Sequence, residues 1–370
     1  MKGLIPAGGE GTRLRPITHT SAKQLLPVAN KPILFYALEH MAEAAIKRVG
    51  IVVGDTRQEI MAAVGDGSRW GLDVSYIHQE APLGLAHCVL IAGDFLGDEE
   101  FVMYAGDNLL GRGVASYVTD FEAEQAAARA PGRQAGAALT SPAAQILLAP
   151  VPDPQRFGVA ELDQQGEVVR LIEKPAQPPS NLALVGVYLF DTRIHEAVRA
   201  IAPSGRGELE ITDAIQWLID SGHRVRSQVV GGYWKDTGTL DALLEGNRLV
   251  LETLEPRVEG TVDDESRIEG RVVVQAGAEI VGSTIRGPAI IGEGTRIEDS
   301  FVGPFTSIYY GCELVGSEIE HSVVLEQSRI VGVSPIVDSL LGKQVEVSRA
   351  ERRPHAVRLM LGDHSHVELA

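Results

Sequence analysis

The chain has 370 residues, of which 44% are hydrophobic and 22% charged, as in a globular protein with more than one domain. Its formal net charge of -17 argues against nucleic acid or an anionic membrane as a partner, because both select basic surfaces. No apolar run approaches the length of a membrane span and the N-terminus lacks a signal-peptide pattern, so we expect a cytoplasmic protein.

The first apolar run, residues 3–5, is followed by a glycine-rich loop. Three of four positions there are glycine, namely Gly8, Gly9 and Gly11. The cationic side chains that follow are those of Arg13, Arg15 and Lys23. Bare backbone N–H groups with cations beside them can hold phosphate. The loop is neither a P-loop nor a dinucleotide fingerprint, because no Gly-Lys-Ser/Thr follows and Leu14 takes the place of the third glycine.

From residue 2 to about residue 254, apolar strands alternate with helical patterns. This alternation predicts an α/β domain with a Rossmann-like, mainly parallel sheet. Helices are expected at residues 34–45, 58–64 and 85–92, and strands at residues 49–53, 74–78 and 101–104. Ligands of such sheets lie beyond the carboxyl ends of the strands, where Gln79, Asp107 and the glycine-rich loop all fall.

Two aspartates stand in similar local settings. Asp107 follows the apolar strand 102–104 in the run Ala-Gly-Asp-Asn, and Asp236 lies in the run Tyr-Trp-Lys-Asp-Thr-Gly. Either residue alone would be an ordinary turn residue. Because Mg²⁺ binds one or two carboxylates together with phosphate oxygens, the two aspartates and the phosphate loop together favour a Mg²⁺ site.

From residue 267 onward helical periodicity is absent, and aliphatic residues recur at intervals of 17 positions. One series consists of Ile268, Ile285, Val302, Ile319 and Ile336, and two further series begin at Val274 and Ile280. Three phased series are typical of a left-handed parallel β-helix with three short strands per coil. We therefore expect a catalytic domain at 1–254, a β-helix at 255–350 and a tail at 351–370. The β-helix favours a homo-oligomer.

The run Gly8-Gly9-x-Gly11-Thr12-Arg13-Leu14-x-Pro16-x-Thr18, followed by Lys23-Gln24-Leu25-Leu26-Pro27-Val28, resembles the signature of sugar-phosphate nucleotidyltransferases. It is most similar to that of the glucose-1-phosphate thymidylyltransferases, and further matches extend over nearly the whole chain. The resemblance implies a Mg²⁺-dependent enzyme that transfers a nucleotidyl group from dTTP to glucose 1-phosphate and releases pyrophosphate.

The resemblance also implies roles for individual residues. The catalytic residues are Arg13, Lys23, Asp107, Lys174 and Asp236, with Asp107 and Asp236 as the metal ligands. The nucleotide-binding residues are Gly8, Gly9, Gly11, Thr12, Arg13, Gln24, Gln79 and Gly84. The sugar-phosphate-binding residues are Asn108, Gly158, Glu173, Lys174, Val185 and Trp234. Lys174 is expected to bind the phosphate and Glu173 to accept the sugar hydroxyls.

Three alternatives remain open. Thymine and uracil differ by one methyl group, which a pocket discriminates by about 1 to 3 kcal/mol in binding free energy, so UTP stays a possible substrate. An enzyme that uses another sugar 1-phosphate is also possible. A catalytically silent regulatory subunit is disfavoured because all five charged catalytic residues are present. The run Arg206–Asp213 also resembles the family, but an ordinary helix N-terminus explains it equally well.

Overall fold

The computed structural model describes residues 1–19, 21–129, 141–349 and 360–368, so the expected C-terminal tail lies partly outside the described residues. The chain forms two compact units. Unit 1 consists of residues 1–10 and 34–234, and unit 2 consists of residues 11–33 and 235–370. The loop after the first strand therefore belongs to the same unit as the C-terminal part. The domain boundaries expected at residues 254 and 350 stay a prediction.

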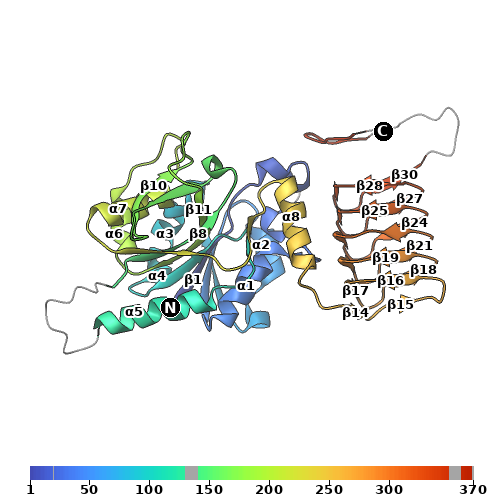
Figure 1. Ribbon diagram of the computed structural model, residues 1–370, viewed down its shortest axis with the longest axis horizontal. Helices are drawn as coiled ribbons and strands as arrows, with labels where there is room; N and C mark the ends of the chain where they lie inside the picture. The colour runs from blue at the N-terminus through green and yellow to red at the C-terminus, as the bar shows by residue number, and fades with distance from the viewer. Residues whose placement is uncertain (20, 130–140, 350–359, 369–370) are drawn as a thin grey trace. The chain divides into compact units, whose positions relative to one another are not determined.

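Unit 1 is built on a mixed nine-stranded sheet (Figure 1). Its strands are β1 (Lys2–Pro6), β4 (Arg48–Val53), β5 (Asp73–His78), β6 (Phe101–Tyr104), β8 (Ala144–Pro150), β9 (Gly158–Leu162), β10 (Val168–Glu173), β11 (Leu182–Phe190) and β12 (Val225–Val229). Their order is β10-β9-β11-β6-β1-β4-β5, with β8 paired to β11 and β12 to β8. Strands β6, β1, β4 and β5 are parallel, whereas β11 is antiparallel to its neighbours. The mostly parallel α/β domain is thus confirmed, with an antiparallel part formed by β11 with its neighbours and by β9 with β10.

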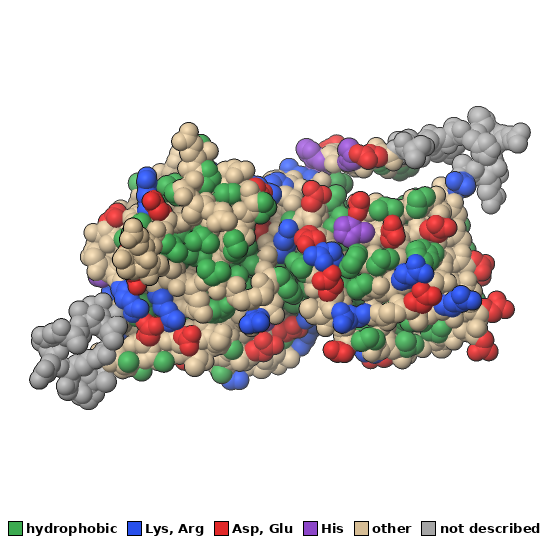
Figure 2. Space-filling model, viewed as in Figure 1, with side chains coloured by type: hydrophobic (Ala, Val, Ile, Leu, Met, Phe, Trp, Pro, Cys, Tyr) green, Lys and Arg blue, Asp and Glu red, His purple; other side chains and the backbone are tan. Residues whose placement is uncertain are grey.

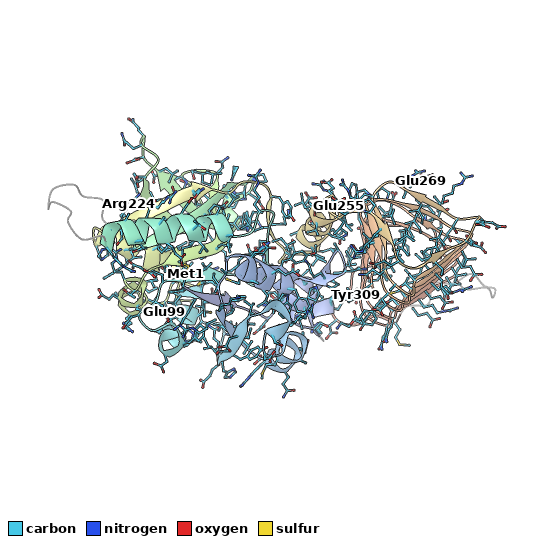
Figure 3. All side chains as sticks on the ribbon, turned by 90° about the horizontal axis from the view of Figure 1, so that it is seen from below. Met1, Glu99, Arg224, Glu255, Glu269 and Tyr309 are labelled. Carbon is cyan, nitrogen blue, oxygen red and sulfur yellow. The ribbon has the colours of Figure 1, made fainter. Side chains whose placement is uncertain are left out.

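Helices cover this sheet, and those predicted in the first third of the chain are present within two residues of the expected ends. The helices are α1 (Ile33–Glu43), α2 (Arg57–Val64), α3 (Leu85–Ile91), α4 (Gly93–Leu96), α5 (Ala115–Arg129), α6 (Ile194–Ala200) and α7 (Ile211–Asp220). A buried core joins Leu4, Phe101 and Tyr188 of the sheet with Ile215 of α7. Arg224, which Figure 3 places beside α5, donates a hydrogen bond to Glu124 of that helix.

Three stacks of short parallel strands form most of unit 2. The first stack contains β14 (Arg257–Val258), β17 (Val272–Val274), β20 (Ala289–Ile291), β23 (Thr306–Ile308), β26 (Val323–Val324) and β29 (Leu340–Leu341). The second contains β15 (Thr261–Val262), β18 (Glu279–Val281), β21 (Arg296–Glu298), β24 (Glu313–Val315), β27 (Arg329–Val331) and β30 (Glu346–Ser348). The third contains β16 (Arg267–Glu269), β19 (Thr284–Arg286), β22 (Phe301–Val302), β25 (Glu318–Glu320) and β28 (Ile336–Val337).

The predicted 17-residue repeat is the register of these stacks. Ile268 pairs with Ile285, Ile285 with Val302, and the series continues through Ile319 to Ile336. The aliphatic side chains of the repeat form one buried core inside the coils. The outer surface carries charges of both signs (Figure 2), as where Arg296 forms an ion pair with Glu279 of the preceding coil. The predicted β-helix is therefore confirmed as a stack of short parallel strands.

Cys88 and Cys312 are both buried free cysteines. Among the described residues, we find no helix with the length and apolar character that a membrane crossing requires.

Candidate active site

The glycine-rich loop begins in unit 1, where Gly8 follows β1. A Cβ atom at Gly8 would lie 3.2 Å from both the Gln79 Oε1 atom and the Gly54 backbone nitrogen. The Gln79 side chain is buried, and its amide nitrogen lies 2.9 Å from Nδ1 of His87. This close approach explains the glycine and brings together two residues that the sequence predicts to bind the nucleotide.

Gly84 lies at the start of α3 with a φ of 100°. A Cβ atom there would lie 2.4 Å from the Leu209 carbonyl oxygen. The two segments are hydrogen-bonded, because Leu209 N donates to Leu83 O at 2.7 Å and Ala86 N donates to Leu209 O at 3.0 Å. Backbone packing alone therefore requires glycine at this position, and its predicted contact with the base stays a prediction.

Asp107 lies in the loop between β6 and β7 (Asn108–Leu110), and Asn108 is the first residue of β7. A Cβ atom at Gly106 would lie 3.1 Å from the Pro6 carbonyl oxygen, so the loop runs against the end of β1. The buried Asn108 amide donates to Asp107 Oδ1 at 3.0 Å. Its own Oδ1 accepts a 2.6 Å hydrogen bond from the Trp234 indole N–H. The structure thus brings three predicted residues together and fixes the orientation of the Asp107 carboxylate.

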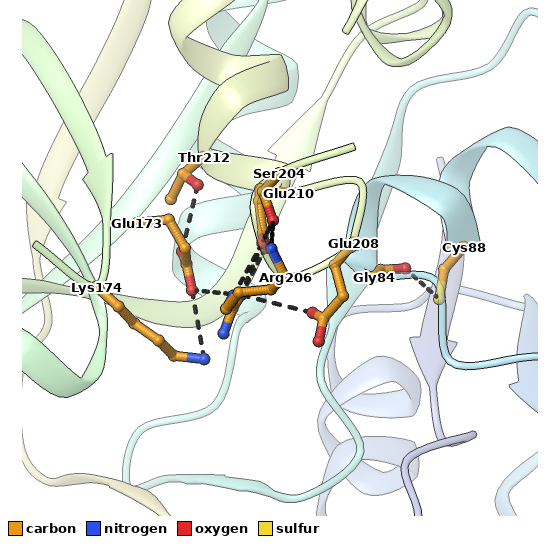
Figure 4. A network of polar contacts seen from close by, with 9 residues as sticks. All are labelled: Gly84, Cys88, Glu173, Lys174, Ser204, Arg206, Glu208, Glu210 and Thr212. Atoms are coloured by element: carbon orange, nitrogen blue, oxygen red, sulfur yellow. Dashed lines mark hydrogen bonds and ion pairs between the residues drawn. The ribbon is translucent and has the colours of Figure 1, made fainter. Parts of the chain in front are cut away.

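At the end of β10, the Glu173 carboxylate is surrounded by polar partners (Figure 4). The Thr212 hydroxyl donates to Glu173 Oε2 at 3.2 Å. On the other side, Oε1 lies 3.6 Å from Lys174 Nζ and 3.3 Å from Arg206 Nη2. Arg206 is also bound at 2.8 Å to the buried carboxylate of Glu210. Two carboxylates, those of Glu173 and Glu210, and two cations therefore share one small region.

Burial raises the pKa of Glu173, and the nearby Glu210 carboxylate raises it further, whereas Lys174 and Arg206 lower the pKa. A Cβ atom at Gly158 would lie 3.1 Å from Glu173 Oε2 and 2.6 Å from Thr212 Cγ2, so this backbone lies against the cluster. Gly158, Glu173 and Lys174, all predicted for the sugar phosphate, are thus together. Val185 is fully buried in β11, and its predicted role stays a prediction.

Arg206 and Thr212 were not among the predicted site residues, although the sequence analysis noted that the run Arg206–Asp213 resembles the family. It treated the run before α7 as a possible helix cap, but Glu210 at the N-cap makes no side-chain capping bond. Arg206 contacts Glu173 instead, across 33 positions of sequence. The sequence indicated such a contact only through the run Arg-Gly-Glu-Leu-Glu, which places three charged residues within five positions.

The rest of the glycine-rich loop belongs to unit 2. Gly11 has a φ of 66°, and a Cβ atom there would lie 2.9 Å from Lys23 Cβ. The Thr18 hydroxyl donates to the Gly11 carbonyl oxygen at 2.7 Å. Short 3-10 turns at Thr12–Leu14 and Lys23–Leu25 complete the loop. The absence of a side chain at Gly11 therefore allows Lys23 to pack against the first part of the loop.

Gln24 is 1% exposed, and its Oε1 atom has no hydrogen-bond partner among the described residues. An unpaired buried amide oxygen costs about 1 to 3 kcal/mol, so such atoms are rare unless a ligand satisfies them. The imide N–H of a pyrimidine is a suitable donor. The burial of Gln24 therefore suits its predicted contact with the base.

Gly238 separates Arg13 from Asp236. The Gly238 N–H donates to Asp236 Oδ1 at 2.9 Å. A Cβ atom on this glycine would lie 2.9 Å from Arg13 Nη2 and 3.1 Å from Asp236 Oδ1. The structure thus brings a predicted phosphate ligand and a predicted metal ligand to the same glycine of unit 2.

We expect the substitution Gly238→Ala to reduce turnover strongly without unfolding the protein. The added methyl group displaces the ends of the Arg13 and Asp236 side chains, and a shift of about 1 Å can cost roughly a hundredfold in rate. Steady-state turnover and thermal unfolding measure the two effects. Gly93→Ala is the matched control, because a Cβ atom there meets nothing within 4 Å. Equal activity of both variants would contradict the assignment.

The predicted charged residues are distributed over both units. Asp107 and Lys174 belong to unit 1, and Arg13, Lys23 and Asp236 to unit 2. Within the described part of the chain, no group of three or more His, Cys, Asp or Glu side chains forms an all-protein metal site. Mg²⁺ does not need one, because it commonly takes one or two carboxylates and completes its shell with phosphate oxygens and water. Each aspartate taken by itself has the ligand chemistry that Mg²⁺ prefers.

Comparisons with known proteins identify the family of the chain. A family described as "Nucleotidyl transferase" matches residues 2–253, more than half of the chain. The protein belongs to this nucleotidyltransferase family. It is 58% identical to a glucose-1-phosphate thymidylyltransferase of Streptomyces griseus over 370 residues, which cover 100% of both chains. A protein of the same name from Streptomyces antibioticus is 57% identical over 100% of this chain and 99% of its own.

More distant relatives match a shorter part. A glucose-1-phosphate thymidylyltransferase of Xanthomonas campestris is 39% identical over 259 residues, 69% of this chain and 82% of its own. A crystal structure from Bacillus anthracis, described as such an enzyme in complex with sucrose, superposes with a TM-score of 0.61 at 31% identity. It covers 70% of this chain and 98% of its own, which supports the α/β fold.

Proposed function

We propose that the protein transfers a thymidylyl group from dTTP to glucose 1-phosphate, giving dTDP-glucose and pyrophosphate. The observation that carries this proposal is the cluster at the end of β10, where Glu173 lies between the cations Lys174 and Arg206. A carboxylate accepts hydrogen bonds from sugar hydroxyls, and cations bind phosphate. One cluster can therefore bind both parts of a sugar phosphate. Similarity to thymidylyltransferases over the full chain supports the choice of nucleotide.

The proposed reaction is a direct displacement at the α-phosphorus. A phosphate oxygen of glucose 1-phosphate forms a bond to this phosphorus, and the bond to the bridging oxygen of the β-phosphate breaks. Pyrophosphate leaves with the electron pair. No general base is needed, since the sugar phosphate is already ionised at neutral pH. The protein instead has to position two anions and offset their repulsion, which suits Arg13, Lys23 and Lys174.

In this proposal Asp107 and Asp236 hold Mg²⁺. The bound ion supplies Lewis-acid neutralisation of phosphate charge. Asn108 and the Gly238 N–H each donate to one oxygen of these carboxylates, at 3.0 and 2.9 Å. Both donors fix how the carboxylates are oriented before any ligand binds.

Base choice rests on Gln24 and Gln79. The unpaired Gln24 oxygen can accept the imide N–H that thymine and uracil share. We therefore expect measurable activity with UTP, because a missing methyl group lowers kcat/KM only by about 10- to 200-fold.

The test is pyrophosphate release across a grid of nucleoside triphosphates and sugar 1-phosphates. The proposal predicts the highest kcat/KM for dTTP with glucose 1-phosphate and only background rates with purine nucleotides. A higher value for UTP, or for another sugar 1-phosphate, would favour the alternative enzyme of the same family.

We expect the affinity for glucose 1-phosphate to depend on the ionisation of Glu173. Its pKa is raised by burial, so the carboxylate becomes protonated at a higher pH than an ordinary Glu and then loses acceptor capacity. The KM for glucose 1-phosphate should therefore rise as the pH falls. The ratio of kcat/KM between the wild type and Glu173→Gln isolates this effect, because the substrate titrates identically with both. A ratio that stays constant from about pH 8 to about pH 5 contradicts the role.

We further propose that the protein acts in the cytoplasm as a homo-oligomer. Its proposed substrates are intracellular metabolites, and stacked β-helices commonly serve in assembly. Light scattering of the full chain and of a chain ending near residue 254 tests the second part, since a monomer in both cases contradicts it.

A further inference from the structure

Helix α8 (Leu240–Leu251) packs against β23 of the β-helix and carries a fully buried Asn247. Three segments of unit 2 meet at this side chain. Its Oδ1 atom accepts hydrogen bonds from the Ala29 N–H at 2.9 Å and from the Ser307 hydroxyl at 2.7 Å. Its amide donates to the Phe305 carbonyl oxygen at 3.1 Å. Asn247 therefore joins residue 29 of the N-terminal loop to the first stack of the β-helix.

The loop segment at this point is a tight hairpin of β2 (Pro27–Val28) and β3 (Lys31–Pro32). Its two turn residues, Ala29 and Asn30, both have positive φ, 47° and 59°. Alanine adopts this conformation only where the surroundings impose it. Asn247 binds the Ala29 N–H, and the Asn30 amide donates to the Ile308 carbonyl oxygen at 2.8 Å. The β-helix therefore holds Asn30 directly and holds Ala29 through Asn247 of α8.

The outer face of the first stack is adapted to this contact. Four of its six outward-facing side chains are almost completely buried, namely those of Val273, Ile290, Ser307 and Val323, whereas Arg257 at one end of the row is exposed and Leu340 at the other is half-buried. The outward positions of the second stack carry exposed charges instead, such as Arg296 and Glu313. A second contact lies further along the β-helix, where a Cβ atom at Gly342 would lie 3.2 Å from Ile17 Cδ1. The β-helix thus touches the loop both before and after Lys23.

We propose that Asn247 is a positioning residue for nucleotide binding, and that the β-helix is the fixed support of the loop that carries Arg13, Lys23 and Gln24. Gln24 is five residues before Ala29 in the chain. A hydrogen bond from Ile33 N to Leu26 O, at 3.1 Å, joins the two ends of the hairpin segment that follows Gln24. Displacement of the hairpin therefore moves Gln24 and Lys23 as well. The inference rests on the proposed function only for the identity of the nucleotide.

The test compares four variants of the full chain. Asn247→Ala removes the junction, and Asn30→Gly removes one side-chain bond while it keeps the positive φ. Ser307→Ala removes one of the two donors to Asn247. Ser322→Ala is the matched control, because this buried hydroxyl donates to the Glu320 carbonyl oxygen at 2.8 Å and accepts from the Ser339 N–H at 3.1 Å, both within the β-helix. Hydrogen exchange of residues 21–33, dTTP binding by calorimetry and both KM values are measured for each.

With Asn247→Ala and Asn30→Gly, we expect roughly tenfold faster exchange in residues 21–33 and a roughly tenfold weaker affinity for dTTP. The KM for glucose 1-phosphate should stay within about twofold, and exchange in β1, β4 and β6 should not change. Ser307→Ala should act in the same direction but less, and Ser322→Ala should not affect the loop.

Unchanged loop exchange in Asn247→Ala and Asn30→Gly would overturn the inference, as would equal losses of affinity for both substrates. Because hydrogen exchange needs no substrate, it decides this question even if the wild type shows no turnover. Absence of turnover in the wild type would refute the proposed function and leave the inference about the loop intact.

Discussion

Asp107→Asn and Asp236→Asn are each expected to abolish turnover while the protein stays folded. Asparagine keeps the shape of aspartate and one oxygen, so the bonds from Asn108 to residue 107 and from the Gly238 N–H to residue 236 can persist. The lost negative charge weakens Mg²⁺ binding. Lewis-acid stabilisation is worth several kcal/mol, which corresponds to roughly a thousandfold or more in rate. Pyrophosphate release at saturating substrate measures the effect.

Asp241→Asn is the control for these two variants, since it removes the same charge from an exposed position in the first turn of α8. Circular dichroism and thermal unfolding show whether each variant is folded. If a folded Asp107→Asn or Asp236→Asn enzyme keeps more than about a tenth of the wild-type rate, that aspartate is structural and does not hold the metal.

Lys174→Ala should raise the KM for glucose 1-phosphate and leave the affinity for dTTP nearly unchanged. Lys174 belongs to the Glu173 cluster of unit 1, where its ammonium group lies 3.6 Å from the carboxylate. A charge-assisted bond to phosphate contributes about 1.5 to 3 kcal/mol, so kcat/KM should fall roughly ten- to a hundredfold or more. Lys23→Ala should instead lower kcat, because its charge acts most strongly on the transition state.

Steady-state kinetics with each substrate varied separates the two lysines. Lys343→Ala is a useful comparison, because Lys343 forms an ion pair with Glu326 on the β-helix. It belongs neither to the Glu173 cluster nor to the glycine-rich loop. A Lys174→Ala enzyme that is impaired toward dTTP and normal toward glucose 1-phosphate would reverse the assignment of the two lysines.

The sequence was most informative where a single periodicity determines burial. The 17-residue series through Ile268 and Ile285 predicts the β-helix, because each inward aliphatic residue packs on its equivalent in the next coil. The strand at residues 101–104 and the helix at 34–45 were equally clear, since each buries one continuous apolar face or run. Local patterns suffice for such elements.

The contacts between distant segments were harder to predict. Arg206 and Glu173 meet because α7 and β10 pack together, and no periodicity encodes that pairing. The sequence does not distinguish Asn247 from an exposed polar residue of a helix, although its side chain is fully buried. One signal was present, since the outward positions Val273 and Ile290 are apolar where the other stacks carry charge. Such a stripe indicates a covered face but does not say what covers it.

The most direct test of the proposed reaction is to identify its products. The full chain is incubated with Mg²⁺, dTTP and glucose 1-phosphate, and phosphorus NMR follows the substrates and products. We expect equimolar dTDP-glucose and pyrophosphate, with no product when glucose 1-phosphate is omitted. Release of dTMP or dTDP without a nucleotide sugar, or no consumption of dTTP by the folded protein, would contradict it.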